Sequence, residues 1–394
     1  MIHTKPHILF ISDWYPDRIN STLGNFIQKH AEAASRHCNV SVIHTCVDEN
    51  LEGKYEVCVE TINSVLTIIV YYKKVKSFWP LISQFQKVLR YLSAYSLGYA
   101  RLSAEKGKPD LVHLNALLHA GLAAWFLKFR HHLNYVYTEH WTGFLPANAQ
   151  FKRFSLKGFL YKYIALQSKV LMPVSENLKD ALIKAGIKGD FQVISNVVDT
   201  DLFRPSLMPH DKSKFRFIHI SHAMDEHKNI SGILRAVEKL RNINSCFSLT
   251  IVSDGDLQPH TKYAISLGIY GTQVSFEGTK TTAEIAHLIS ISDCLLLFSN
   301  YENFPCVIPE AMACGIPVIS TNVGGIAEHV NNSNGILVSP RNENELVMAM
   351  KKMIENSVSF QSEKLRDYSV TYFSYNTIAD QLFSVYKRVL EKNA

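Results

Sequence analysis

The sequence of 394 residues lacks the features that mark several protein classes. Its seven cysteines include no Cys-x-x-Cys pair, so neither a disulfide framework nor a zinc site is expected, and reduced thiols fit a cytoplasmic protein. The N-terminal apolar run, residues 8–11, is too short for a signal peptide. The most apolar stretch, residues 111–129, is interrupted by His113, Asn115 and His119, which argues against a membrane span there.

No low-complexity block or internal repeat is present, which excludes collagen-like, coiled-coil and linker-dominated chains. What is present is typical of a globular protein: 47% hydrophobic and 19% charged residues, in a chain long enough for two domains. The net charge of +6 is uneven, since residues 1–200 hold 23 Lys and Arg against 15 Asp and Glu. This excess predicts an anionic partner for the first half, such as a membrane surface; no nucleic-acid-binding module is recognisable, and nucleic acid is not expected.

Short apolar runs alternate with amphipathic stretches, which predicts parallel sheets covered by helices on both faces. The predicted strands are 7–12, 40–45, 66–71, 111–114, 135–138, 170–174, 192–195, 217–221, 248–253, 273–277, 294–298 and 318–320. Because the alternation restarts near Phe215, we expect two doubly wound α/β domains, residues 1–200 and 201–370. Ligands of such sheets bind at the carboxyl ends of the strands.

The most informative segment is residues 299–318, which follows the predicted strand 294–298 and leads into a short helix that Gly315 can end. The N–H groups of residues 304–308 would lie at the start of that helix, a place that suits phosphate. Glu302 and Glu310 would lie at different depths along one side of a ligand. The alternative interpretation is a pair of solvated charges on a helix surface.

This segment resembles the EX7E signature of retaining glycosyltransferases of family 4, which have the GT-B fold. Further resemblances, in the family's order, are Pro173–Glu176, Asn196–Phe203, Val252–Asp256 and Thr321–Glu328. The resemblance implies a hexosyltransferase-type enzyme with two Rossmann-like domains facing each other across a cleft. Residues 1–200 would bind the acceptor and residues 201–370 the nucleotide-sugar donor, with a C-terminal helix in 371–394 packing back toward the first domain.

The resemblance also implies roles for individual residues. Glu302 matches the residue that contacts the transferred sugar, and His140 the one that hydrogen-bonds it; these two are the expected catalytic residues. Glu310 matches the ribose-binding glutamate, and Lys228 the lysine that pairs with the diphosphate. The remaining donor-binding positions are Phe304, Pro305, Cys306, Val307, Gly324, Gly325 and His222. An acceptor and diphosphate loop is expected at Gly24, Asn25 and Asp13.

Two of these positions leave alternatives open. The family usually has an arginine where Ser221-His222-Ala223 stands, so either His222 replaces it, another cation does, or Lys228 and backbone amides suffice. Asp13 lines the cleft or caps a helix N-terminus.

The resemblance implies a donor co-substrate but no cofactor, because GT-B enzymes of this kind generally need no metal. Two DxD-like triplets, Asp199-Thr200-Asp201 and Asp254-Gly255-Asp256, raise the possibility of manganese, but both stand at expected turns. The alternative functions are a sugar-nucleotide 2-epimerase and a non-catalytic nucleotide-sugar-binding protein. A nicotinamide-dependent oxidoreductase is not expected, since no G-x-G-x-x-G follows the first strand.

Residues 151–164 combine aromatic side chains with Lys and Arg at helical spacing. A helix of this composition can lie in the headgroup region of an anionic membrane, which would place the protein at the cytoplasmic face. The alternative is an ordinary helix with a buried aromatic stripe and solvated lysines. Membrane contact would suit a lipid-linked glycan acceptor in the synthesis of a cell-surface polysaccharide or glycolipid.

Overall fold

The computed structural model describes residues 5–75, 80–117, 119–206, 213–356 and 358–392. The chain forms two compact units. Unit 1 contains residues 1–144, 149–197 and 375–394, and unit 2 contains residues 145–148 and 198–374. The divisions after residues 197 and 374 lie a few residues from the limits of 200 and 370 expected from the sequence. The short segment 145–148 groups with unit 2, which the sequence did not indicate.

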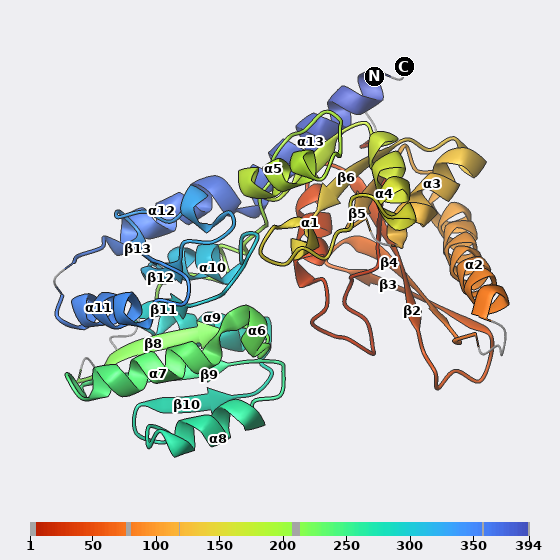
Figure 1. Ribbon diagram of the computed structural model, residues 1–394. Helices are drawn as coiled ribbons and strands as arrows, with labels where there is room; N and C mark the ends of the chain where they lie inside the picture. The colour runs from red at the N-terminus through yellow and green to blue at the C-terminus, as the bar shows by residue number, and fades with distance from the viewer. Residues whose placement is uncertain (1–4, 76–79, 118, 207–212, 357, 393–394) are drawn as a thin grey trace. The chain divides into compact units, whose positions relative to one another are not determined.

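Unit 1 is a seven-stranded sheet flanked by helices (Figure 1). Its strands are β1 (His7–Ser12), β2 (Asn39–Val47), β3 (Tyr55–Ile62), β4 (Val65–Tyr72), β5 (Leu111–Asn115), β6 (Tyr135–Glu139) and β7 (Leu171–Pro173). Its helices are α1 (Asn25–Ser35), α2 (Pro80–Lys106), α3 (Ala120–His131), α4 (Leu156–Leu166), α5 (Glu176–Lys184) and α13 (Tyr375–Glu391), with the 3-10 turn η1 (Thr142–Phe144). The strand order is β3-β4-β2-β1-β5-β6-β7.

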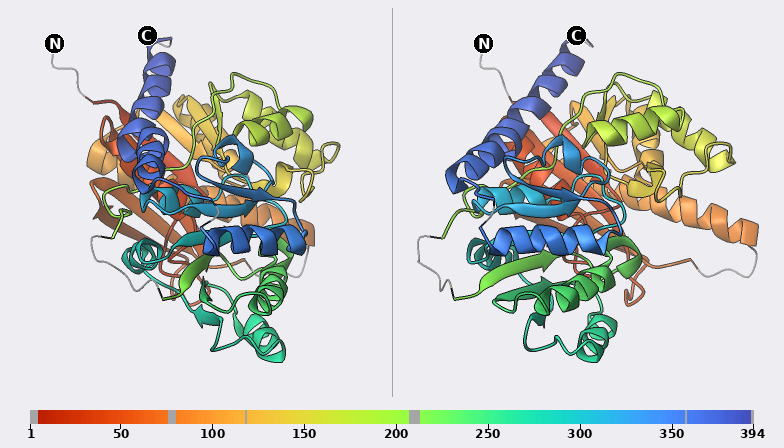
Figure 2. Two further views of the ribbon diagram at one scale, coloured as in Figure 1. Left: turned by 90° about the vertical axis from the view of Figure 1, so that its left-hand side faces the viewer. Right: turned by 60° about the vertical axis from the view of Figure 1, so that its left-hand side comes forward.

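The central strands of unit 1 are buried on both faces. All six residues of β1 are buried, and β1 pairs in parallel with both β2 and β5. Ile8 and Phe10 join α1 and α13 in one apolar cluster. The C-terminal helix α13, blue in Figures 1 and 2, therefore completes the core of unit 1 beside α1.

Unit 2 is a six-stranded parallel sheet of order β10-β9-β8-β11-β12-β13. Its strands are β8 (Phe215–Ile220), β9 (Phe247–Val252), β10 (Val274–Glu277), β11 (Cys294–Leu297), β12 (Val318–Thr321) and β13 (Gly335–Val338). Its helices are α6 (Asp225–Lys228), α7 (Ile230–Arg241), α8 (Gln258–Ser266), α9 (Thr282–Ser290), α10 (Val307–Ala313), α11 (Glu343–Ile354) and α12 (Ser362–Phe373), with the 3-10 turn η2 (Ile326–Glu328).

Alternation along the strands divides the core of unit 2 in two. Leu296 joins a cluster with α7, α8 and α11, whereas its neighbours Leu295 and Leu297 join one with α9, α10 and α12. Successive side chains of a strand point to opposite faces, so the sheet is covered on both sides, as the sequence pattern predicted.

Three details of the sequence prediction were wrong or incomplete. Residues 192–195 form no strand: Gln192 and Ile194 donate backbone hydrogen bonds to Leu171 and Pro173, but β7 offers only three residues for pairing. The sequence analysis missed β3 and β13, and β3 pairs antiparallel with β4. The helix expected within 151–164 begins only at Leu156, where the Ser155 hydroxyl accepts the N–H of Gly158.

Across the described residues, no helix has both the length and the apolar composition needed to cross a membrane.

Candidate active site

The loop after β11 carries a buried ion pair. The Glu302 side chain is 6% exposed, and its Oε1 lies 2.5 Å from Nζ of Lys228, whose side chain is 13% exposed. Nε2 of His227 lies 3.5 Å from the other carboxylate oxygen. Burial raises the pKa of Glu302, but the charge of Lys228 and the contact with His227 outweigh it and lower the pKa to about 2. Glu302 is therefore an ionised carboxylate that can accept hydrogen bonds from hydroxyl groups.

Lys228 and Glu302 meet because the strands that precede them are neighbours. β8 and β11 pair in parallel, and the strand order reverses between them, with β9 and β10 on one side and β12 and β13 on the other. Sheets of this kind bind ligands at the carboxyl ends of the strands, where the order reverses. The ion pair thus lies where a parallel sheet usually holds its ligand.

Backbone and ring contacts hold the two loops together. The N–H of Asn300 donates to the carbonyl of His227 over 2.8 Å, and its side chain donates to the carbonyl of Glu226. The ring of His227 stacks on Tyr301 with centroids 4.2 Å apart and an interplanar angle of 4°. Lys228 is therefore held beside Glu302 by the residues that precede each of them in the sequence.

The predicted loop Gly324–Gly325 packs directly on the backbone of Glu302. Gly324 has φ of +57°, and a Cβ built there would lie 1.7 Å from the carbonyl oxygen of Glu302. The N–H of Gly325 donates to the carbonyl of Asn303 over 2.6 Å. Glycine is required at position 324 because a side chain there would occupy the position of the Glu302 backbone.

Helix α10 carries Glu310, whose side chain is buried. The helix ends as expected at Gly315, which has φ of +74°: its N–H donates to Met312 and that of Ile316 to Ala311, the two hydrogen bonds of a Schellman motif. The carboxyl group of Glu310 thus lies on a short helix whose end is fixed by Gly315.

The start of α10 differs from the prediction of free N–H groups at 304–308. Pro305 has no N–H, and Ile308 donates to the carbonyl of Pro305 over 3.1 Å. Phe304 is 2% exposed and packs against the rings of His329 and Phe373, so its side chain belongs to the core rather than to a donor pocket. Pro305, Cys306 and Val307 are half-buried.

His222 lies on the loop after β8 and is half-exposed. Its Nδ1 is 2.9 Å from Oδ1 of Asp254, on the loop after the neighbouring strand β9. A histidine that faces a carboxylate is a poor replacement for an arginine toward phosphate, because the carboxylate repels the anion. His222 therefore contacts the neighbouring loop. This geometry favours the option in which Lys228 and backbone amides suffice for the diphosphate.

In unit 1, His140 follows the end of β6 and is buried. Its ring lies 4.7 Å from Phe26 and 5.5 Å from His30, both on α1. Burial holds the pKa of His140 well below its usual range, so the ring is neutral. The preceding Glu139 orients this turn, since one carboxylate oxygen accepts the N–H groups of His140 and Trp141, each over 2.8 Å.

Gly24 stands just before α1 with φ of +75°, and a Cβ there would lie 2.4 Å from the carbonyl oxygen of Trp14. Its own carbonyl accepts the N–H groups of Ile27 and Gln28. Asn25 is the first residue of α1 and is half-buried. The requirement for glycine at this position comes from the close approach of two backbone segments of the loop.

Asp13 follows β1 and caps a helix, but not the helix that comes next in sequence. Its Oδ2 accepts the N–H groups of His119 and Ala120 at the start of α3, over 2.7 and 2.9 Å. Its Oδ1 accepts the hydroxyl of Tyr91 over 2.6 Å. Because β1 and β5 are adjacent where the order of this sheet reverses, Asp13 ties together the two loops that leave this point.

Among the described residues, Asp17, His44 and Cys46 are the one group whose ligand atoms, within 4.8 Å of one another, could hold a metal ion. Nδ1 of His44 lies 2.9 Å from the carbonyl of Ser12, and Nε2 lies 3.1 Å from Oδ2 of Asp17. Both ring nitrogens of His44 thus lie within hydrogen-bond distance of an oxygen atom of the protein. In the first DxD-like triplet, Asp199 accepts backbone N–H groups from Asp201 and Leu202. In the second, Asp256 accepts the N–H of Gln258.

The sequence analysis did not single out His227, Tyr301 or Glu139, which the structure places against the predicted residues. His227 directly precedes Lys228 in the sequence, and Tyr301 directly precedes Glu302. An aromatic ring beside each charged residue was therefore the sequence signal that could have identified them. Glu139 gave no signal of its own, because its hydrogen bonds depend on how the chain turns after β6.

Comparisons with known proteins agree with this division of the chain. The family model described as Glycosyltransferase Family 4 matches residues 24–202, and the one described as Glycosyl transferases group 1 matches residues 208–370. One relative is an MMP alpha-(1→4)-mannosyltransferase of Mycolicibacterium hassiacum. It is 27% identical over 319 residues, which are 76% of each chain.

Two solved structures share the fold over nearly the whole chain. Sucrose-phosphate synthase from Thermosynechococcus elongatus has a TM-score of 0.77 and 20% identity, covering 98% of this chain and 100% of that one. The Anabaena protein HepE, solved in complex with UDP, has a TM-score of 0.73 and 18% identity over 97% and 100% of the two chains.

Proposed function

This chain belongs to glycosyltransferase family 4 and is a hexosyltransferase-type enzyme with the GT-B fold, and from this premise we propose that it transfers a sugar from a nucleoside diphosphate sugar with retention of the anomeric configuration. The acceptor is a glycan or a lipid-linked glycan in the synthesis of a cell-surface polysaccharide or glycolipid. The observation that supports the proposal is the buried Lys228–Glu302 pair at the strand reversal of unit 2. It offers a cation for a diphosphate and a carboxylate for sugar hydroxyls.

In the proposed reaction, Lys228 neutralises charge as the bond from the anomeric carbon to the diphosphate breaks. The acceptor oxygen bonds to the same face of that carbon, and its proton passes to an oxygen of the leaving phosphate. Glu302 and the neutral ring of His140 orient the transferred sugar, and Glu310 holds the ribose. No side-chain nucleophile and no metal ion take part, so the protein contributes positioning and electrostatic stabilisation. Proton NMR of the first product distinguishes retention from inversion.

We expect a nucleoside diphosphate to stabilise the protein in the presence of EDTA. A ligand at 100 times its dissociation constant adds about 2.7 kcal/mol to the free energy of unfolding. UDP, GDP and ADP are compared by thermal unfolding, and the one that stabilises identifies the donor's nucleotide. Glu310→Ala should weaken its binding by about 1–4 kcal/mol, as expected for a charge-assisted contact. The control is Glu363→Ala, an exposed carboxylate of α12. Stabilisation only with added metal would contradict the proposal.

We also propose that unit 1 contacts an anionic membrane through α4 and the adjacent α3. Large apolar side chains are exposed on these helices and just before α4: Trp125 (40%), Phe129 (77%), Phe154 (81%), Leu156 (88%), Phe159 (56%) and Tyr163 (49%). Tyr161 is buried whereas Phe159 and Tyr163 are exposed, so the aromatic side chains of α4 do not all face the core. Lys152, Arg153 and Lys157 lie exposed among them. Exposed apolar side chains with exposed basic residues close to them in sequence suit a bilayer with anionic headgroups.

Vesicle cosedimentation tests this surface. Wild-type protein should bind phosphatidylglycerol vesicles but not phosphatidylcholine vesicles, and salt should weaken the binding. Replacing both Leu156 and Phe159 with serine should lower the affinity about tenfold or more, because two exposed apolar groups no longer enter the interface. The control is Ile243→Ser, at an apolar residue of unit 2 whose exposure, 58%, is close to that of Phe159. Salt-independent binding, or no binding, would remove the membrane surface from the proposal.

A further inference from the structure

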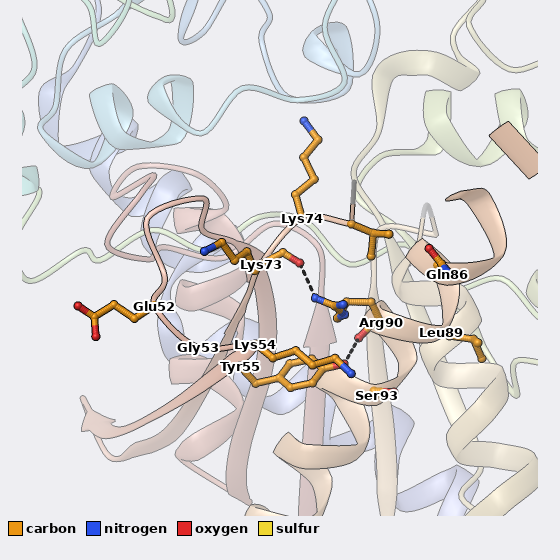
Figure 3. Close-up of a pocket in the computed structure, with 11 residues that line it drawn as sticks. Glu52, Gly53, Lys54, Tyr55, Lys73, Lys74, Gln86, Leu89, Arg90 and Ser93 are labelled. Carbon is orange, nitrogen blue, oxygen red and sulfur yellow. Dashed lines mark hydrogen bonds between the residues drawn. The ribbon is translucent and has the colours of Figure 1, made fainter. Parts of the chain in front are cut away.

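A large basic pocket lies on unit 1, between the β3–β4 hairpin and the first half of α2 (Figure 3). Its volume is about 770 Å³. The charged residues that line it in the described part of the chain are four cations, Lys54, Lys73, Lys74 and Arg90, and one carboxylate, Glu52. None of the residues assigned to the sugar donor belongs to this pocket.

Two of the cations converge on one aromatic ring. Nζ of Lys54 lies 5.5 Å from the centroid of the Tyr55 ring, and the guanidinium of Arg90 lies 5.7 Å from it. In the described part of the chain, neither cation has a carboxylate within ion-pair distance. Both cations would attract an anion bound beside the ring, because neither is neutralised by a carboxylate there.

The backbone around the pocket holds Arg90 in place. Its Nη1 donates to the carbonyl of Lys73 over 2.9 Å, and the hydroxyl of Tyr55 donates to the carbonyl of Arg90 over 3.5 Å. Figure 3 shows Lys54 extended beside Tyr55 and the guanidinium of Arg90 directed toward the carbonyl of Lys73, while the ammonium group of Lys74 points away from the ring. Lys73 donates to the carbonyl of Leu51 over 2.9 Å. The ammonium group of Lys74 lies 3.3 Å from the carboxylate of Glu49. Lys54 and Arg90 are therefore the cations available to a bound group, and Lys73 adds to the positive potential.

An exposed apolar surface begins at the rim of the pocket. Phe85 is 65% exposed and Leu89, which lines the pocket, is 48% exposed, four residues apart on the same face of α2. A second pocket of about 540 Å³ shares Lys74, Val75 and Arg90 with the first and reaches Asp13 at the carboxyl end of β1. The basic pocket is thus bordered by an apolar helix face and by the strand ends where ligands of a parallel sheet bind.

We propose that this pocket binds the phosphate group of an amphiphilic acceptor, with the phosphate between Lys54 and Arg90 and the hydrocarbon chain along Phe85 and Leu89. The inference rests on the proposed glycosyltransferase function and names the chemical class of its acceptor: a phosphate attached to a lipid. A guanidinium and an ammonium together provide the several N–H donors that a phosphate accepts.

Calorimetric titration of the full chain with three probes tests the site: decyl phosphate, inorganic phosphate and decyl glucoside. Decyl phosphate should bind, and Lys54→Gln should weaken it about tenfold, as expected for the loss of one hydrogen bond to a charged group. Arg90→Lys keeps the charge but loses the planar fork, and should weaken it less. Lys188→Gln, at an exposed lysine of unit 1, is the matched control and should leave the affinity unchanged.

The three probes separate the sources of the phosphate. Tighter binding of decyl phosphate than of inorganic phosphate supports the lipid phosphate, whereas equal binding of the two overturns the lipid part. Equal binding of decyl glucoside and decyl phosphate overturns the phosphate site, and so does a Lys54→Gln variant with wild-type affinity. Stabilisation by a nucleoside diphosphate is measured on the same samples. A protein that binds the nucleotide but not decyl phosphate would retain the proposed function and refute only this acceptor site.

Discussion

Replacing Lys228 with methionine is expected to lower the free energy of unfolding by about 3 kcal/mol at neutral pH, because Glu302 would remain buried as an unpaired carboxylate. Methionine keeps the length of the side chain and removes only its charge. The size follows from the pKa of Glu302: a decrease from 4.5 to about 2 corresponds to about 3 kcal/mol of interaction with the ionised form. Chemical denaturation of both proteins under identical conditions measures the difference.

The pH dependence gives this prediction a second readout. Since the folded protein lowers the pKa of Glu302, the ion pair stabilises it above pH 4.5, where the unfolded chain is also ionised. The contribution is lost as the pH falls from 4.5 toward about 2. The stability difference between wild type and Lys228→Met should therefore be largest near neutral pH and shrink below pH 4.5. A difference that stays constant with pH would show that the carboxylate is not its source.

A double variant separates stability from catalysis. Lys228→Met combined with Glu302→Gln replaces the buried charges with neutral groups of similar size, and should regain most of the lost stability. It should not regain activity, because transfer is proposed to need the cation at the diphosphate. We expect kcat/KM to remain lower by about 100-fold or more in both variants. Recovery of activity along with stability would make the pair structural only.

Local sequence patterns predicted most of the strands because their signal is carried by neighbouring residues. The run Cys294–Phe298 is continuously apolar, and β11 is buried on both faces. The missed hairpin shows the limit of such patterns. β3, at the sheet edge, mixes polar and apolar residues without regular alternation, and its turn uses Asn63 and Ser64, both with positive φ, in place of the more recognisable Asn-Gly.

Residue spacing alone indicated only the part of the candidate site that lies in one segment, whereas Lys228 and His140 were assigned through the resemblance to the family. Glu302, Glu310 and Gly315 stand within one strand-loop-helix unit, so their spacing was visible. The ion pair between Lys228 and Glu302 was not, because it depends on β8 lying beside β11 although β9 and β10 come between them in sequence. The same holds for Asp13, whose cap on α3 depends on β1 lying beside β5.

Gly324→Ala should displace Glu302 through its backbone rather than through its carboxylate. The added Cβ would lie 1.7 Å from the carbonyl oxygen of Glu302 and 3.0 Å from that of Asn303, and both are backbone atoms that cannot rotate away. The positive φ of Gly324 adds about 1 kcal/mol of strain for any other residue. Because the backbone of Glu302 must shift, we expect a loss of about 3 kcal/mol or more in the free energy of unfolding. Nucleoside diphosphate binding should be lost with it.

Gly271→Ala isolates the part of this effect that comes from contact. Gly271 also has a positive φ, of +73°, but nothing lies within 4 Å of a Cβ built there. It should therefore show only the conformational strain, about 1 kcal/mol, and retain nucleotide binding. If the two variants lose the same stability, contact with the Glu302 backbone contributes nothing at Gly324. If Gly324→Ala loses nucleotide binding while remaining folded, the position of the Glu302 loop, and not the stability of unit 2, is what the donor site requires.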